Sequence, residues 1–327
     1  MNLLVSGGAG YIGSIATRRL LDLGYKVSVI DNLSHGFRKA VAKEADFFEI
    51  DISNLEQVSL ICKKNKIEAV LHFAAFIEVG ESVKFPEKYL ENNFKKAEKF
   101  LEAVVGSGVK KFILSSTAAV YGSPTEVPIP ESHAKNPINP YGESKSRFED
   151  VLEGFRKTQK ISYACLRYFN VAGAMPDASL GEAHEPETHL IPNILLAAMG
   201  KRPELQIFGD DYPTRDGTCV RDYVHVVDLI DAHLLALKAL ASTDKLICNV
   251  GSEEGFTVKE VIAAAERMSG KKIPFKQMPR REGDPAVLIA SSNKIRNELG
   301  WKPNYPGLDA MIEHAWHWHQ SHPNGYK

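Results

Sequence analysis

Three side chains in the middle of the chain have the types and spacing of an acid–base group. Tyr141 and Lys145 stand four residues apart in NPYGESK, and Thr117 lies upstream in STAAVYG. The Asn-Pro pair before Tyr141 favours a helix start there, and this spacing then puts the phenol and the ammonium on one helix face. The ammonium would lower the pKa of the phenol and make it a general base near neutral pH, with Thr117 supplying a hydroxyl to the same reacting oxygen. A tyrosine and a lysine at this spacing are more often surface or packing residues, so the hypothesis depends on further motifs.

A glycine-rich turn near the start of the chain predicts a dinucleotide site. In GGAGYIG, Gly8, Gly10 and Gly13 give the spacing GxGxxG, and Gly7, Gly10 and Gly13 give GxxGxxG. A side chain at these positions would keep the backbone away from a pyrophosphate, and the following helix offers free N–H groups and its positive dipole end. The alternative is a plain tight turn, but the motif lies between a predicted strand and a predicted helix.

Two acidic residues follow at the ends of later strands. Asp31 comes eighteen residues after Gly13, where a carboxylate can bind the adenosine ribose hydroxyls and repel a 2′-phosphate, which predicts NAD and not NADP. The alternative is that Asp31 only caps the following turn. For Asp51 an adenine contact and a plain cap remain open.

The elements that must position these residues alternate between strands and helices. Apolar β-type runs at 2–6, 26–31, 46–51, 69–75 and 111–116 are separated by helical patterns at 12–23, 55–64 and 82–105. This alternation predicts an α/β fold with a Rossmann-type, doubly wound parallel sheet covered by helices on both faces.

The second half of the chain predicts a smaller, loop-rich α/β lobe that binds substrate. A strand at 162–169 is followed by a stretch rich in Gly, Pro, acidic residues and His at 173–192. We expect an NAD-binding domain at 1–172, which also receives roughly 219–252, and a substrate-binding lobe made mainly of 173–327. Ligands of parallel sheets lie beyond the carboxyl ends of the strands, so we expect a cleft between the lobes.

Composition and charge exclude several classes of protein. The 327 residues are 44% hydrophobic and 25% charged, which is ordinary for a folded soluble chain. Forty basic and forty-one acidic residues give a net charge of −1, so no positive field gathers nucleic acid or anionic membrane. Four scattered cysteines, the lack of a secretory leader and the lack of an eighteen-residue apolar run predict a cytoplasmic protein.

With these motifs in place, the chain resembles the extended short-chain dehydrogenase/reductase family and, within it, the UDP-glucose 4-epimerases. The resemblance covers nearly the whole chain through GGAGYIGS, DNLS, HFAA, VGES, SSTAAVYG, NPYGESK, RYFNVAGA, HLIP, FGDDYPTRDGTCVRDYVHV, REGDPA and HPNGY. It implies interconversion of UDP-galactose and UDP-glucose by NAD-dependent oxidation at C4 and return of the hydride to the opposite face. It also implies a UDP-hexose substrate and a homodimer.

The resemblance also assigns residues to roles. Tyr141 would be the base, Lys145 its electrostatic partner and a ribose ligand, and Thr117 the hydroxyl beside it. The cofactor would contact Gly7, Gly10, Tyr11, Ile12, Gly13, Asp31, Asn32, Asp51, Ile52, Phe73, Ala74, Asn92 and Tyr168. The nucleotide sugar would contact Asn170, His189, Leu190, Gln206, Phe208, Arg221, Arg281, Asp284 and Leu288. Arg221 and Arg281 suit a pyrophosphate because guanidinium groups pair bidentately with phosphate oxygens.

The sequence departs from the family pattern at a few positions. Ile15 stands where many relatives have His, and Ile77 and Glu78 stand where some have Lys, so a lysine contact to cofactor phosphate is not carried over. Leu288 occupies a position where relatives carry a bulky Tyr or a small residue such as Cys. In the family this side chain borders the C2 substituent of the sugar, so we expect slow but detectable turnover of UDP-N-acetylhexosamines.

Two histidine-rich stretches raise the question of a metal. GEAHEPETHLIP holds His184 and His189, and EHAWHWHQSHP holds His314, His317, His319 and His322. Neither has a standard zinc spacing and the proposed chemistry needs no metal, so we expect none.

Alternative functions differ in what they require. A nucleotide-sugar 4,6-dehydratase needs an acidic pair beside the threonine, where this chain has Ala118 and Ala119. A 4-epimerase of another UDP-sugar, such as an N-acetylhexosamine, a pentose or a uronate, remains open. A non-catalytic NAD or nucleotide-sugar sensor on the same fold is disfavoured by the complete Thr117, Tyr141 and Lys145 set.

Overall fold

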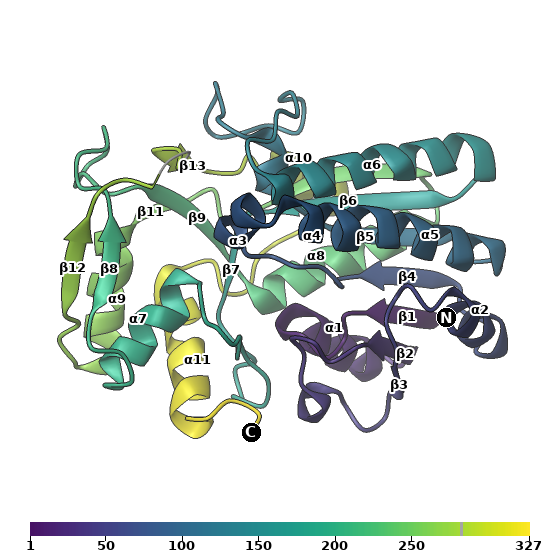
Figure 1. Ribbon diagram of the computed structural model, residues 1–327, viewed down its shortest axis with the longest axis horizontal. Coiled ribbons are helices and arrows are strands. Elements are labelled where there is room, and N and C mark those ends of the chain that lie inside the picture. Colours follow the sequence, from purple (N-terminus) through teal and green to yellow (C-terminus); the bar gives the residue numbers. More distant parts are fainter. Residues whose placement is uncertain (282–283) are drawn as a thin grey trace. The chain divides into compact units, whose positions relative to one another are not determined.

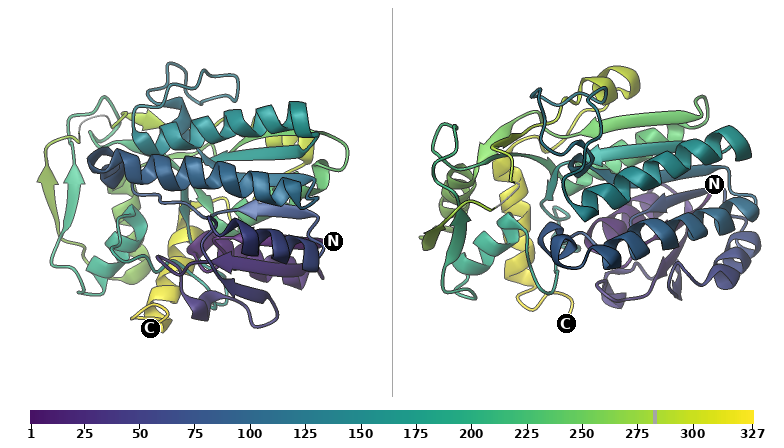
Figure 2. Two further views of the ribbon diagram at one scale, coloured as in Figure 1. Left: turned by 45° about the vertical axis from the view of Figure 1, so that its right-hand side comes forward. Right: turned by 45° about the horizontal axis from the view of Figure 1, so that its top comes forward.

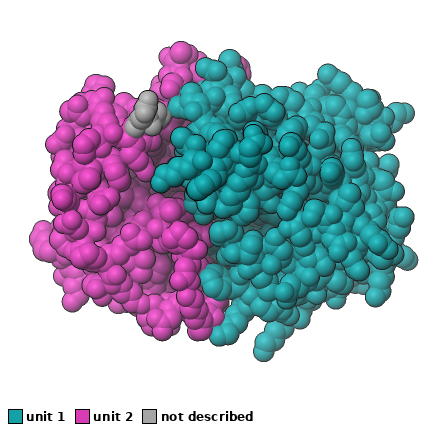
Figure 3. Space-filling view, viewed as in Figure 1, with its two compact units in different colours: residues 1–122, 134–167, 230–248 teal, residues 123–133, 168–229, 249–327 magenta. Residues whose placement is uncertain are grey.

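The computed structural model describes residues 1–281 and 284–327, which form two compact units (Figure 3). Unit 1 consists of residues 1–122, 134–167 and 230–248, and unit 2 of residues 123–133, 168–229 and 249–327. The chain therefore passes from one unit to the other several times.

A seven-stranded sheet with Rossmann topology forms the centre of unit 1 (Figure 1). Its order is β10-β6-β5-β4-β1-β2-β3, and the pairs β1–β2, β1–β4, β2–β3 and β4–β5 are parallel. The strand order reverses direction between β1 and β4, which is where such sheets bind their ligands. The strands are β1 (Asn2–Ser6), β2 (Lys26–Asp31), β3 (Asp46–Glu49), β4 (Ala69–His72), β5 (Lys111–Thr117), β6 (Ser162–Tyr168) and β10 (Lys245–Val250). The predicted fold class and strands are confirmed.

Helices cover both faces of this sheet (Figure 2). On one face α2 (Leu55–Lys64), α5 (Ala97–Gly106) and α6 (Pro140–Gln159) pack on buried strand residues such as Leu4, Val70 and Phe112. On the other, α1 (Tyr11–Asp22) is joined to α8 (Val226–Ala239) by an ion pair of 2.7 Å between Arg19 and Asp231. Two short 3₁₀ turns, η1 (Arg38–Ala40) and η3 (Ala118–Tyr121), complete this unit.

The helical pattern predicted over 82–105 is divided into several pieces. It consists of α3 (Val79–Lys84), α4 (Pro86–Leu90), the π-helical turn η2 (Glu91–Lys96) and α5. Pro86 lacks an N–H and disfavours a helical conformation at Phe85, so the first break falls there. In η2 the buried Asn93 amide bonds both the N–H and the C=O of Phe76, which places its side chain against the loop after β4.

The described residues of unit 2 form short strands and helices. The strand β9 (Val220–His225) pairs in parallel with β7 (Asn170–Ala172) and β13 (Val287–Leu288), and antiparallel with β11 (Gly255–Thr257). A separate parallel ribbon joins β8 (Leu205–Phe208) to β12 (Phe275–Met278). The helices are α7 (Leu190–Ala198), α9 (Val258–Ser269), α10 (Asn293–Leu299) and α11 (Leu308–Ser321). Residues of α7, α9 and α11, including Leu195, Ile262 and Ile312, form its hydrophobic core.

The state of the cysteines and the character of the helices can be compared with what the composition predicts. Cys62, Cys165, Cys219 and Cys248 are all free and buried. Among the residues that the structure describes, no helix combines the length and the apolar character needed to cross a membrane.

Candidate active site

The glycine turn between β1 and α1 has the geometry of a phosphate site. Gly7 has a φ of +77°, and a Cβ atom there would lie 2.5 Å from the main-chain nitrogen of Ala74. A Cβ atom on Gly13 would lie 2.1 Å from the Gly7 carbonyl oxygen. Helix α1 starts after Gly10 with no capping side chain and no acidic residue in its first turn. A helix start of this kind presents N–H groups and its positive dipole end to an anion, so these residues fit the pyrophosphate of a dinucleotide.

Asp31 ends β2 beside this turn. Its two carboxylate oxygens accept hydrogen bonds from the main-chain N–H groups of Ala9 at 2.9 Å and Leu33 at 2.8 Å. Burial raises the pKa of Asp31, and these hydrogen bonds oppose the rise. The bond to Leu33 is the turn cap considered as an alternative, and the bond to Ala9 ties the carboxylate to the glycine turn.

Asp51 and Asn32 contact each other. The Asn32 amide donates to Asp51 at 2.7 Å, and the other Asp51 oxygen accepts from the N–H and the hydroxyl of Ser53. Burial raises the pKa of Asp51, but these hydrogen bonds outweigh it and leave the pKa below its ordinary value. The cap of α2 is Asn54, not Asp51.

The remaining predicted cofactor residues are distributed over several elements. Phe73 and Ala74 follow β4, and Ala74 lies against Gly7. Tyr11 is buried in the first turn of α1, which also holds Ile12, while Ile52 is part of the hydrophobic core. Asn92 lies in η2 and its amide donates to Asn93 at 3.1 Å. Tyr168 is the buried last residue of β6.

Unit 1 brings the three predicted catalytic residues together around the end of β5 and the start of α6. Asn139 caps α6 by accepting from the Gly142 N–H, and Pro140 is its first residue, so the predicted helix start is confirmed. Thr117 is the last residue of β5, and its hydroxyl hydrogen-bonds the phenol of Tyr141. One turn along α6, the buried Lys145 ammonium donates to the Ser115 carbonyl oxygen at 2.9 Å.

The electrostatics of this group are set by burial. Burial raises the pKa of Tyr141 above its ordinary value, the hydrogen bond from Thr117 lowers it, and the charge of Glu78 raises it further. Burial lowers the pKa of Lys145 to about 8, against the charges of Cys165 and Glu149. The sequence predicted that Lys145 lowers the pKa of the phenol. The protein's own residues raise the pKa of Tyr141 instead, because desolvation of the phenol is the largest effect.

A buried ion pair supports the catalytic helix and was not predicted from the sequence. Glu149, one turn after Lys145, binds Arg167 through contacts of 2.9 and 2.6 Å and accepts the Ser116 hydroxyl at 2.6 Å. Arg167 also donates to the Tyr121 hydroxyl at 3.0 Å. These contacts fix α6 against β5 and β6 below the catalytic residues. Glu and Arg at distant positions carry no local signal of such pairing.

The three positions that depart from the family pattern differ in their surroundings. Ile15 is fully buried in α1, and Ile77 is half-buried. Glu78 accepts the Tyr89 hydroxyl at 3.0 Å, and its charge acts on Tyr141. Glu78 is therefore a charged neighbour of the proposed base that the motifs did not reveal.

Unit 2 joins four of the predicted substrate residues in one group. Asp284 pairs with Arg221 at 3.4 Å and with Arg281 at 2.9 Å, and the Arg281 guanidinium lies 4.9 Å from the centre of the Phe208 ring. Leu288 on β13 is the register partner of Arg221 on β9. Glu282 and Gly283 of the REGDPA motif lie outside the described residues.

Other predicted substrate residues have separate partners. Asn170 donates to the Asp222 carbonyl oxygen at 2.9 Å. Gln206 is exposed on β8, two residues before Phe208. His189 and Leu190 lie at the start of α7, and the His189 ring is part of a cluster with Glu182, His184 and Glu187 that the sequence motifs did not predict.

Comparisons with known proteins agree with this geometry. Residues 3–251 match the model of the NAD dependent epimerase/dehydratase family. The chain is 52% identical to a UDP-glucose 4-epimerase of Lacticaseibacillus casei over all of this chain and 99% of that protein. Its structure is similar to a crystal structure of a UDP-glucose 4-epimerase, with a TM-score of 0.97, 45% identity and complete coverage of both chains. It is also similar to the UDP-glucose 4-epimerase of Stenotrophomonas maltophila with bound NAD and formylated UDP-arabinopyranose, with a TM-score of 0.95, 39% identity and 99% coverage of both.

Proposed function

The chain belongs to the NAD dependent epimerase/dehydratase family, and on this basis we propose that it is an isomerase that interconverts UDP-galactose and UDP-glucose. The observation that carries the proposal is the hydrogen-bonded Thr117 and Tyr141 pair with Lys145 one turn away on α6. The glycine turn before α1 fits the cofactor of this chemistry.

The residues would act as follows. Tyr141, once ionised, takes the proton of the sugar 4-hydroxyl and later gives it back. Thr117 orients the phenol through their hydrogen bond, and the Lys145 ammonium stabilises negative charge on the phenol oxygen. Bound NAD would supply the acceptor for the hydride of C4 and the donor for its return to the opposite face, and its positive ring would oppose the raised pKa of Tyr141.

The nucleotide must stay anchored while the hexose turns over. We assign this anchoring to Arg221 and Arg281, because guanidinium groups bind the diphosphate bidentately and Asp284 already holds both of them in one place. Leu288, beside Arg221, would then border the sugar. Between removal and return of the hydride the sugar is a 4-keto compound that must not leave.

Two further properties belong to this proposal. The protein acts in the cytoplasm, which the four free, buried thiols support because they suit a reducing compartment. It acts as a homodimer, as the family resemblance implies, and light scattering of the purified protein measures this directly.

The test is turnover of single substrates. We expect purified protein to convert UDP-galactose to UDP-glucose fastest when UDP-galactose, UDP-N-acetylgalactosamine, UDP-arabinose and UDP-galacturonate are supplied separately and products are read by NMR. Faster conversion of another sugar would reassign the substrate but keep the chemistry. No epimerisation of any of the four, in protein that binds NAD, would favour a non-catalytic sensor.

A further inference from the structure

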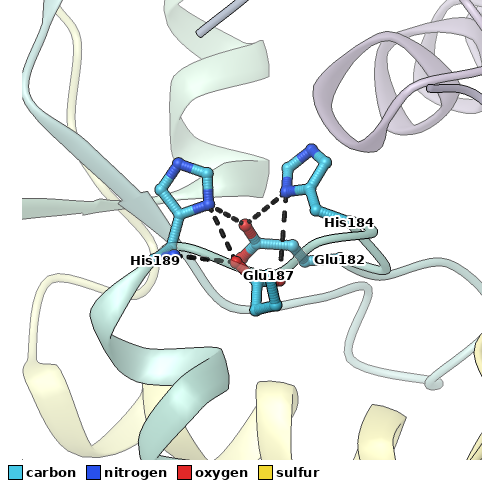
Figure 4. A group of neighbouring side chains, drawn as sticks. All are labelled: Glu182, His184, Glu187 and His189. Atoms are coloured by element: carbon cyan, nitrogen blue, oxygen red, sulfur yellow. Dashed lines mark hydrogen bonds and ion pairs between the residues drawn. The ribbon is translucent and has the colours of Figure 1, made fainter. Parts of the chain in front are cut away.

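Four side chains of one loop in unit 2 converge on a common point. Glu182, His184, Glu187 and His189 each direct one nitrogen or oxygen atom inward, and these atoms all lie within 4.8 Å of one another (Figure 4). The four residues come from a single stretch of eight, directly before α7. None of them belongs to the proposed acid–base group.

Hydrogen bonds and ion pairs join the two imidazoles and the two carboxylates of the cluster. Both Nδ1 atoms face the same oxygen, Oε1 of Glu182, at 2.9 Å from His184 and 2.8 Å from His189. The second carboxylate, Glu187, lies 3.1 Å from Nδ1 of His189 and 3.9 Å from Nδ1 of His184. Two carboxylates and two imidazoles therefore surround one small volume, which needs positive charge at its centre or on both rings.

Burial of the two carboxylates increases the free-energy cost of leaving their negative charge without a positive partner. The side chains of Glu182 and Glu187 are only 6% and 7% exposed. Two neighbouring carboxylates this far from water are costly unless cations pair with them. Two protons can supply the charge, but they create two imidazolium rings whose centres are 5.2 Å apart and repel each other. One divalent ion supplies the same charge without that repulsion.

Further hydrogen bonds hold the backbone at Gly181 and Glu182 and the carboxylate of Glu187. The Trp318 indole N–H donates to the Glu182 carbonyl oxygen at 2.9 Å. The Tyr326 hydroxyl bonds both the N–H and the C=O of Gly181, at 3.0 and 3.1 Å. Glu187 Oε1 accepts the N–H groups of Thr188 and His189, each at 2.8 Å. The carboxylate of Glu187 is thus oriented by contacts of the kind that support ligands in metal sites, while the bonds from Trp318 and Tyr326 fix the backbone that carries Glu182.

We propose that Glu182, His184, Glu187 and His189 bind one divalent transition-metal ion, with Zn²⁺ as the best fit. With bonds of about 2.0 to 2.2 Å, neighbouring ligand atoms of a tetrahedral zinc site lie about 3.3 to 3.6 Å apart. The nitrogen–oxygen separations here run from 2.8 to 3.9 Å, on both sides of that range. Imidazole nitrogen selects Zn²⁺ and its neighbours over Mg²⁺ and Ca²⁺, which prefer oxygen ligands alone.

The ion would link residues at the two ends of the loop before α7, because all four ligands belong to that loop. It replaces the two Nδ1 protons, so its binding releases protons and strengthens as the pH rises. It also fixes the ring plane of His189, which the resemblance assigns to the nucleotide sugar, but the metal site stands without that assignment. The earlier expectation of no metal relied on standard zinc spacings, and E-x-H-x₂-E-x-H is not one of them.

Metal binding by the whole protein tests the proposal. Tag-free protein is treated with EDTA, desalted and titrated with Zn²⁺ against a chromophoric chelator, and separately with Co²⁺. We expect one Zn²⁺ per chain, the visible absorption of four-coordinate Co²⁺, and a rise in Tm of at least about 2 °C with Zn²⁺. Absence of Zn²⁺ binding and of any change in Tm in the folded wild-type protein would overturn the proposal.

Variants locate the ion. Glu182→Gln and His184→Gln should weaken Zn²⁺ binding by at least about 100-fold, since each removes a ligand. Glu185→Gln is the matched control, because Glu185 lies in the same loop but is exposed and pairs with Lys327. Unchanged Zn²⁺ affinity in folded Glu182→Gln and His184→Gln proteins would place the ion elsewhere and overturn the assignment. If these variants do not fold, the wild-type Zn²⁺ and Co²⁺ titrations decide.

Discussion

The glycine turn of unit 1 offers phosphate only main-chain N–H groups, whereas the substrate group of unit 2 offers two arginine side chains that Asp284 already binds. Binding at the turn needs no side chain to move, and it is unchanged by most substitutions other than those of the glycines. If the arginines bind the diphosphate as we propose, it competes with Asp284 for the same donors. On the proposed assignment, unit 1 therefore binds a constant ligand and unit 2 an adjustable one.

The acid–base group of unit 1 and the arginine group of unit 2 also differ in how firmly their side chains are held. In unit 1 the Thr117 hydroxyl is hydrogen-bonded to the Tyr141 phenol, and the Lys145 ammonium donates to the Ser115 carbonyl oxygen, so β5 and α6 hold all three groups. In unit 2 the Arg281 side chain is 60% exposed, and Arg221 is 14% exposed. We therefore expect substitutions in unit 1 to change kcat and substitutions in unit 2 to change binding and substrate choice.

The largest expected effect is that of Tyr141→Phe. The change removes one hydroxyl and leaves the ring, so the fold and the binding of NAD and UDP-sugar should persist while kcat falls by about 10²- to 10⁴-fold. NMR of UDP-galactose turnover and calorimetry of UDP binding measure the two parts. Near-normal turnover would remove Tyr141 from the role of base.

The difference between the units also explains what the sequence could predict. The strands of unit 1, the start of α6 and the glycine turn follow from apolar alternation, from Asn139 and Pro140, and from the need of Gly7 and Gly13 for close backbone approach. These signals are local in sequence. Pro86 is a local signal of the helix break at Phe85. The prediction of one helix over 82–105 follows instead from the helical periodicity on both sides of this break.

The features that the sequence did not predict depend on distant residues. The pair of Glu149 and Arg167 and the charge of Glu78 near Tyr141 arise only when separate elements pack together. Likewise, Glu182 and His189 carry no recognised spacing, and their convergence depends on the path of the loop between them. Burial and electrostatics of this kind are properties of the folded chain and not of a motif.

Arg221→Met should produce the next largest effect. It removes a mostly buried guanidinium, so we expect the Kd for UDP to rise by about 10- to 100-fold, with kcat changed much less. Arg281→Met should do less because this side chain is exposed. Arg267→Met serves as the control, since Arg267 is an exposed arginine of unit 2 that pairs with Asp309. If kcat in the Arg221 variant fell by as large a factor as the affinity for UDP, unit 2 would contribute to the chemical step.

Leu288→Tyr tests whether unit 2 is adjustable. Leu288 is half-buried beside Arg221 on β9, and an aliphatic side chain changes rotamer at a cost of about 1 kcal/mol. We expect wild-type protein to turn over UDP-N-acetylglucosamine slowly, and Leu288→Tyr to lose that activity while it retains UDP-galactose turnover. Persistence of the N-acetyl reaction in the variant, or its absence in the wild type, would exclude Leu288 as the gate.

The smallest expected effect concerns Glu78, a carboxylate whose charge raises the pKa of Tyr141. After burial, the charge of Glu78 is the second influence that raises the pKa of this phenol, and the base must lose its proton to act. Glu78→Gln removes the charge but keeps an oxygen that can accept the Tyr89 hydroxyl, so the fold should be retained. The pKa of Tyr141 then falls, so the acid limb of the kcat profile moves to lower pH.

Glu81→Gln is the matched control for this change. Glu81 also accepts the Tyr89 hydroxyl, at 2.8 Å, whereas the carboxylate charge that raises the pKa of Tyr141 is that of Glu78. The acid limb of this variant should coincide with that of the wild type. If both variants move the limb equally, the contact with Tyr89 and not the charge of Glu78 controls the base. If neither variant moves the acid limb, the pKa of Tyr141 in the working enzyme is set by burial, Thr117 and the cofactor. The acid–base group of unit 1 would then depend even less on side-chain charge than the comparison with unit 2 implies.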